Sequence, residues 1–288
     1  MSRTHAIPQV EGRPMAVLLP HKPPAPSRWR VPRLRFVHLV GFVGLSLVVG
    51  GGAFAQANGA RLSALEVIWK WSPLLLSGFG FNILMSVLAM ALGTAAGILL
   101  GLAQIGENRT LRSLAWGATQ FFRNAPWLVL LFFAMFMIPF QFRLFGYTVP
   151  FPDWVKAVIG FSLPVMANMS EIVRGAVASL PSGQWEAAES LAFSRRQTLW
   201  MIILPQCVKR MLPPWMNLYS LITMATVQAS IVGVSEMLTL TAQVHAAEGG
   251  RPDLLAPLYG FAMLCFFVYC YPIERFTLYL ERRFQLNQ

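Results

Sequence analysis

The chain has 288 residues, of which 56% are hydrophobic and only 12% are charged, and its mean hydropathy is positive. This balance excludes an ordinary soluble domain and is typical of a protein with several membrane-spanning segments. The net charge of +11 could indicate nucleic-acid binding, but the basic residues lie mainly in loops between apolar runs, so we expect no nucleic-acid partner. The three cysteines and four histidines lack metal-ligand spacing, so we expect no metal site and no cofactor.

The N-terminal segment, residues 1–35, is basic and proline-rich. It contains seven Lys or Arg residues and one Glu, and we predict a disordered cytoplasmic tail that can contact anionic membrane lipid. Residues 36–56 are predicted to form the first transmembrane helix, because an apolar run of about 20 residues can cross a bilayer. The sequence Ala53-Phe54-Ala55 resembles a signal-peptidase site, which leaves a cleaved signal peptide as an alternative.

Two long apolar runs follow at residues 73–105 and 114–140, after an external link at residues 56–72. Small residues in the first run, including Gly97, should allow another helix to approach closely. Asn82 is polar in an apolar helix, so it either lines a transport path or bonds to a neighbouring helix. In the second run, Arg123 should lie near the cytoplasmic end, and Pro126 should kink the helix because it removes a hydrogen bond.

Residues 141–153 are predicted to form an external hairpin, and residues 154–178 the fourth span. Glu171 and Arg174 are three residues apart, so they share a helix face and can pair. We favour a structural ion pair there over a substrate contact. Asn168 lies about one turn deeper and is the better candidate for the translocation path.

A polar stretch at residues 181–214 interrupts the apolar pattern, and such a stretch must lie in water or against protein. A turn at residues 181–183 should lead into a short helix with Trp185, Ala188 and Ala192 on one face. Ser194 and Gln197 fit a capping box that would start a second helix.

Pro205 should interrupt that second helix, and Pro213-Pro214 should open the next element. The fifth span is predicted at residues 215–242, with Gln228 as a polar candidate for the path. After an external link at residues 243–253, the core of the last span is predicted at residues 256–271, and residues 281–288 should form a cytoplasmic tail. Only five of the 23 Lys and Arg residues fall on the external side, which favours both termini in the cytoplasm.

The polar stretch carries a specific pattern, in which Glu186-Ala187-Ala188 is followed by Ala192 and then by Ile-Ile-Leu204-Pro205. This pattern resembles the EAA loop of ABC-importer permeases, which has Gly where this chain has Ala192. Since Ala is the better helix former, the exchange should cost little in helix formation, although it adds a methyl group. The resemblance implies a coupling helix that docks into a groove of a cytoplasmic ATPase. The docking residues would be Gly183, Glu186, Ala187, Ala188, Ala192, Leu204 and Pro205.

Two further blocks extend the resemblance to the polar amino-acid uptake permeases. One block contains Arg123 and Pro126, with Leu130 in place of the family's Gln. The other contains Glu171, Arg174 and Gly175 in register with the family pattern. On this basis residues 74–280 are assigned to an ABC type-1 transmembrane permease domain.

The predicted fold is an all-α polytopic membrane protein with six transmembrane helices and a cytoplasmic coupling helix between spans four and five. The resemblance implies a permease subunit of an ATP-driven importer for polar amino acids or their derivatives, in the bacterial inner membrane. Its partners would be an ATPase dimer, a second permease (identical or paralogous) and an external solute-binding protein. The chain has no P-loop, so we expect ATP hydrolysis in a partner chain and no catalytic residue here.

The alternative function is an ion-coupled secondary transporter, for which Glu171 and Glu236 are the candidate intramembrane carboxylates. A membrane enzyme is disfavoured, because the sequence has no suitable set of His and acidic residues.

Overall fold

The structure is a computed structural model that describes residues 62–144 and 147–285. The predicted tail, the first span and the signal-peptide alternative lie outside these residues. The described chain is built from helices apart from one hairpin of two antiparallel strands, which confirms the all-α class and the predicted hairpin. The elements are α2 (Ala64–Ile105), α3 (Arg109–Asn124), α4 (Trp127–Met137), β1 (Gln141–Leu144), β2 (Tyr147–Pro150), α5 (Asp153–Ala178), α6 (Gly183–Ser190), α7 (Arg195–Gln197), a π-helical segment (Thr198–Ile203), α8 (Leu204–Ala225), a 3-10 segment (Thr226–Val232), α9 (Met237–Ala247) and α10 (Pro252–Gln285).

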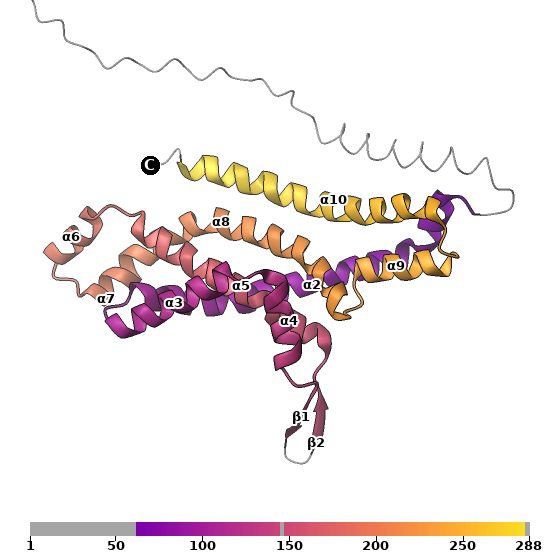
Figure 1. Cartoon of the computed structure of the whole chain (residues 1–288). Coiled ribbons are helices and arrows are strands. Elements are labelled where there is room, and N and C mark those ends of the chain that lie inside the picture. Colours follow the sequence, from indigo (N-terminus) through magenta and orange to yellow (C-terminus); the bar gives the residue numbers. More distant parts are fainter. Residues whose placement is uncertain (1–61, 145–146, 286–288) are drawn as a thin grey trace, which may run out of the picture. The chain divides into compact units, whose positions relative to one another are not determined.

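The long helices α2, α5, α8 and α10 run beside one another and form the main body of the described chain (Figure 1). Helices α2 and α5 approach closely because glycines of α2 face α5. A Cβ atom at Gly97 would lie 2.6 Å from the backbone oxygen of Met166, and Cβ atoms at Gly93 and Gly101 would lie 2.4 and 2.7 Å from the side chains of Val165 and Val173. The predicted close approach at the small residues of α2 is therefore confirmed, as is usual where helices pack through small residues.

Three clusters of buried apolar side chains hold the helices together. The largest lies among α2, α4, α5 and α8 and includes Met85, Leu131, Phe161 and Ile222. A second cluster joins the start of α2 to α9 and α10. The third, which we call the α6 seat, contains Ala176, Val177, Leu180, Ile203 and Cys207.

Helix α2 begins earlier than the sequence suggests, within the predicted external link. Ser63 caps it, since its hydroxyl accepts from the Glu66 N–H while the Glu66 carboxylate accepts from the Ser63 N–H at 2.7 Å. This capping box starts the helix before Pro73, which the helix then accommodates.

The predicted third span is two helices rather than one kinked helix. Helix α3 ends at Asn124, Pro126 is the N-cap of α4, and the two axes are bent by 106°. Pro126 thus stands where a helix begins, a position that needs no backbone donor. The predicted hairpin follows as strands β1 and β2, which project away from the long helices (Figure 1).

The predicted fifth span is also broken. Helix α8 passes into the 3-10 segment, and α9 begins at Met237 with a bend of 52°. We call residues 226–236 the α8–α9 break.

The prediction that Pro205 interrupts a helix and that Pro213-Pro214 opens the next one is wrong. Pro205 occupies the first turn of α8, where a missing N–H is tolerated, and the other two prolines lie inside α8.

By length and composition, α2 and α10 can each cross a membrane, and the described chain has up to four such spans if each bent pair is one span. Helix α5 is not among them, although it was predicted as a span. Half of its 26 residues are buried, because α2, α3, α4 and α8 surround it. A helix shielded by others can carry polar residues that lipid would not tolerate.

Candidate functional site

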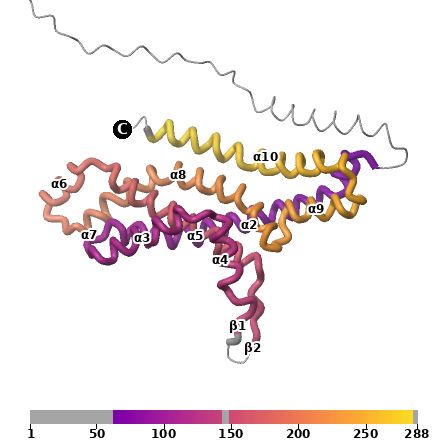
Figure 2. Tube along the Cα trace, viewed as in Figure 1, coloured from indigo at the N-terminus to yellow at the C-terminus, as the bar shows by residue number. Residues whose placement is uncertain are grey.

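Helix α6 lies at one end of the molecule, beyond the adjoining ends of α5 and α8 (Figure 2). Its inner face is formed by Ala188, which is 2% exposed, and by Trp185, which packs against the α6 seat. Glu186, Ala187 and Glu189 are exposed. The Glu-Ala-Ala sequence therefore presents its first two residues outward and its third inward.

Helix α6 ends before Ala192, which corrects the prediction that Ala192 shares a helix face with Trp185 and Ala188. Ala192 has φ +59°, in the left-handed region. Its N–H donates to the Glu189 oxygen at 2.9 Å, and the Phe193 N–H donates to the Ala188 oxygen at 3.1 Å. These two bonds form a Schellman motif, in which glycine is usual at the position of Ala192. Alanine is therefore unfavourable here, contrary to the expectation from helix propensity.

The chain then turns back toward the membrane helices through a second capped element. Ser194 and Gln197 form the predicted capping box, with the Ser194 N–H donating to Gln197 Oε1 at 2.9 Å. Leu204 is half-buried and Pro205 is exposed at the start of α8. Gln206 Nε2 donates to Gln184 Oε1 at 3.3 Å, which ties α8 to α6.

Gly183 is the first residue of α6, and within the described residues no heavy atom outside its local helix lies within 4 Å of where a Cβ would be. The packing of the described chain therefore gives no reason for glycine at this position.

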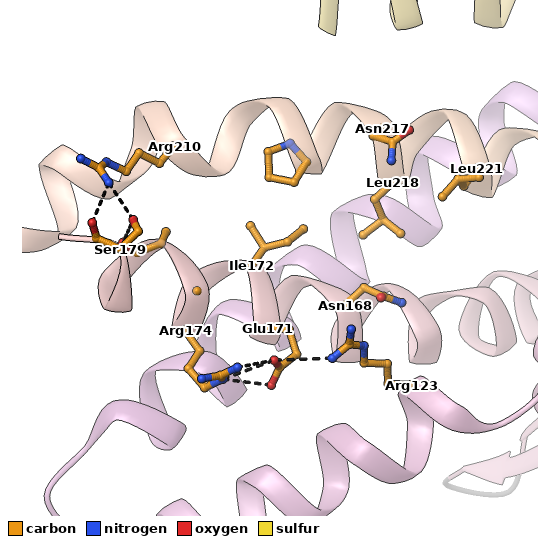
Figure 3. Close-up of a pocket in the computed structure, with 13 residues that line it drawn as sticks. Arg123, Asn168, Glu171, Ile172, Arg174, Ser179, Arg210, Asn217, Leu218 and Leu221 are labelled. Atoms are coloured by element: carbon orange, nitrogen blue, oxygen red, sulfur yellow. Dashed lines mark hydrogen bonds and ion pairs between the residues drawn. The ribbon is translucent and has the colours of Figure 1, made fainter. Parts of the chain in front are cut away.

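A cavity of about 610 Å³ opens between α5 and α8 (Figure 3). Its polar lining is formed by Arg123, Asn168, Glu171, Arg174, Ser179, Arg210 and Asn217. With three arginines and one glutamate, the lining of the cavity carries a net positive charge. We call it the inner cavity.

The predicted pair of Glu171 and Arg174 is present in the inner cavity. The Glu171 carboxylate accepts from Arg174 Nη2 at 2.8 Å and from Nε at 3.2 Å (Figure 3). Arg123 of α3 also lies 3.6 Å from this carboxylate, so Glu171 joins α3 to α5. Gly175 lines the same cavity one residue after Arg174. The sequence spacing predicted the Arg174 partner of Glu171, but it could not predict Arg123, which lies on another helix.

Arg210 has a different role on the opposite wall. Its Nη1 donates to the backbone oxygen and the hydroxyl of Ser179, both at 2.8 Å, and so caps the end of α5 (Figure 3). Among the described residues it has no carboxylate within ion-pair distance. Sequence analysis missed this contact, because the two residues lie 31 positions apart.

The three predicted path residues do not lie together. Asn168 faces the inner cavity and donates to the Pro164 oxygen at 2.8 Å. Asn82 is fully buried and bonds to both ends of the α8–α9 break. Of the two roles predicted for Asn82, these contacts match bonding to a neighbouring helix. Gln228 lies within that break, and its Oε1 is buried with no hydrogen-bond partner in the described chain.

Comparison with known proteins identifies the family. Residues 93–286 match the family described as "Binding-protein-dependent transport system inner membrane component". The chain belongs to this family. It is therefore a multi-pass, inner-membrane permease subunit of a binding-protein-dependent ABC transporter, a membership that implies an ATPase and a binding protein as partners.

The relatives of this permease are amino-acid permeases. It is 34% identical to the "Probable amino-acid ABC transporter permease protein YckA" of Bacillus subtilis over 74% of this chain and 89% of that protein. It is 28% identical to the "Glutamine transport system permease protein GlnP" of Escherichia coli strain K12 over 77% of this chain and 97% of that protein. The permease thus belongs to the polar amino-acid ABC permeases.

A solved structure supports the fold of the permease. The chain superposes on the "Crystal structure of an amino acid ABC transporter with histidines" with a TM-score of 0.65 and 22% identity, over 75% of this chain and 96% of that one. At this identity the likeness concerns the fold alone.

Proposed function

We propose that this permease imports polar amino acids or amino-acid derivatives, driven by ATP hydrolysis in a partner ATPase dimer that docks on α6. The observation that carries the coupling part of this proposal is the placement of α6, a short helix seated at one end of the molecule with Glu186 and Ala187 facing outward. The substrate class rests on the names of the relatives, which describe a probable amino-acid permease and a glutamine permease.

The proposed topology has six spans and both termini in the cytoplasm. Residues 36–56 form the first span, and the others are α2, the bent pair α3–α4, α5, the broken helix α8–α9, and α10. Residues 74–280 form the permease domain. The low number of basic residues on the external side supports this orientation, since basic residues are enriched in cytoplasmic loops.

In the proposed mechanism, α6 transmits motion of the ATPase to the membrane helices. Trp185 and Ala188 rest on the α6 seat, whose side chains come from the C-terminal end of α5, the π-helical segment and α8. A displacement of α6 therefore acts on both α5 and α8, the two walls of the inner cavity. ATP binding can shift the permease between inward-facing and outward-facing states only through such differential contacts.

The proposed path runs through the inner cavity, completed by a second permease that is either identical or a paralogue. Asn168 is the proposed contact there, while Asn82 and Gln228 contribute at the α8–α9 break. The proposal treats Glu171, Arg123 and Arg174 as a structural ion-pair network, because the one carboxylate is already shared by two guanidinium groups. An external solute-binding protein would deliver the substrate.

The test is tagged purification of the permease from native membranes in mild detergent, followed by mass spectrometry. We expect a P-loop ATPase to copurify with the wild type and to be lost from Glu186→Lys. The control is Glu107→Lys, which makes the same charge change at an exposed position outside α6, where Glu107 has a surface contact with Arg195 at 3.6 Å. A permease that purifies alone and transports without ATP would instead favour the ion-coupled carrier.

A further inference from the structure

The α8–α9 break is held at both ends by one side chain of α2. Asn82 Nδ2 donates to Thr226 Oγ1 and to Glu236 Oε2, both at 3.0 Å. Asn82 Oδ1 accepts from the Met237 N–H at 3.1 Å. Thr226 is the first residue of the 3-10 segment, whereas Glu236 and Met237 start α9. A single amide therefore fixes the distance between the two ends of the break.

Both oxygens of the Glu236 carboxyl group accept hydrogen bonds in this arrangement. Its second oxygen, Oε1, accepts from the Thr239 N–H at 2.9 Å and so caps α9. The side chains of Asn82, Thr226 and Glu236 are all completely buried. Buried polar groups are costly unless each is paired, so these three residues form a matched set in which each donor faces an acceptor.

The close approach of α2 to α9 depends on Gly78, one turn before Asn82. A Cβ atom there would lie 2.6 Å from Leu240 Cδ1 and 2.9 Å from the Cα of Met237. A side chain at position 78 would therefore push α9 away from α2 and disturb the hydrogen bond between the Met237 N–H and Asn82. The packing of the two helices and the hydrogen bonds therefore specify the same geometry.

The α8–α9 break contains Gln228, whose Oε1 is buried and accepts no hydrogen bond from the described residues. Irregular backbone at membrane depth occurs where it is buried in protein or lines a cavity. An unpaired carbonyl oxygen in such a segment is suited to accept from a donor that arrives with the substrate, such as the ammonium group of an amino acid. The oxygen is covered in this state, so a substrate reaches it only when the segment shifts during transport.

We propose that Asn82 and Glu236 are positioning residues for transport, which hold the α8–α9 break so that Gln228 meets the substrate amino group. The part that concerns the substrate rests on the proposed amino-acid import. The part that concerns the geometry of the break does not.

The test exploits the polarity of the Asn82–Glu236 bond. Glu236→Gln can place an amide donor against the Asn82 donor, and Asn82→Asp places two carboxyl groups together. The double variant Asn82→Asp/Glu236→Gln restores a donor facing an acceptor with the direction reversed. Ser86→Ala is the matched control, because Ser86 is equally buried in α2 but, within the described part of the chain, bonds only to the Ile83 oxygen of its own helix.

Two quantities are measured on the full permease complex. The first is amide hydrogen exchange of peptides covering residues 226–236. The second is the apparent KM and Vmax of ATP-driven uptake in proteoliposomes, for each of the twenty common L-amino acids in radiolabelled form. We expect each single variant to raise the exchange rate and the apparent KM by about ten-fold, because one buried group loses its partner. The double variant should return both to within about two-fold of wild type.

Different outcomes refute different parts. If the single variants behave as Ser86→Ala does, or if their effects add in the double variant, the positioning role is wrong. If exchange recovers in the double variant but KM never changes in the single variants, the three residues only stabilise the fold. If wild type takes up none of the twenty amino acids, import of the common amino acids is refuted and only a derivative is left as substrate, and the exchange data still decide the geometry of the break.

Discussion

Replacing Ala192 by glycine should stabilise the end of α6. The left-handed conformation of Ala192, with φ +59°, costs a residue other than glycine about 1–2 kcal/mol. Glycine loses about 0.4–1 kcal/mol more conformational entropy than alanine on folding. The balance leaves a gain of roughly 0.5–1 kcal/mol for Ala192→Gly.

The assay is hydrogen exchange of the backbone amides of Ala192 and Phe193, which donate to the Schellman bonds. In the glycine variant the Phe193 amide should exchange about two- to five-fold more slowly, as that free-energy gain requires. Ala187→Gly is the control on the same helix. Since Ala187 is exposed in the helix interior, glycine there should cost about 1 kcal/mol and speed exchange. Faster exchange in Ala192→Gly as well would refute the left-handed assignment.

Three further predictions concern packing, buried charge and pH. Gly97→Ala should destabilise the permease by about 1–3 kcal/mol in thermal unfolding, since the new Cβ meets backbone at 2.6 Å, whereas Gly80→Ala has open space and should not. Ala188→Asp should abolish uptake while the protein still inserts in the membrane, because a buried, unpaired carboxylate would displace α6; uptake at the wild-type rate would contradict this. The hydrogen bond from Lys70 holds the pKa of the Glu248 carboxyl below its ordinary value of 4.5. The contact therefore stabilises the fold above pH 4.5, and this stabilisation is lost as the pH falls through the lowered pKa. Glu248→Gln should therefore reduce the acid-induced drop in melting temperature, and an unchanged drop would exclude the contact as its cause.

Local sequence patterns predicted local structure well. The capping box of Ser194 and Gln197 and the pair of Glu171 and Arg174 both depend on residues three positions apart, and both are present. The short helix α6 also follows from its composition. In each case the interacting groups belong to the same turn, so helix geometry alone brings them together.

Features that depend on the path of the chain could not be predicted in this way. Asn82 finds its partners 144 and 154 positions away, and Arg123 reaches Glu171 from a different helix. Ala192 was expected to be helical because its spacing from Trp185 and Ala188 fits one helix face, but reversal of the chain after α6 sets its φ value instead. Pro205 shows the same limit, since its effect depends on whether it stands at the start of a helix or inside one.

The most direct test of the central claim is ATP-driven uptake by the reconstituted permease complex, with ATP supplied on the side of α6. The account predicts uptake that stops when ATP is removed, and a loss of uptake in Glu186→Lys although the permease is still inserted. Uptake that continues without ATP, or at the wild-type rate in Glu186→Lys, would contradict the assignment of α6 as the coupling helix.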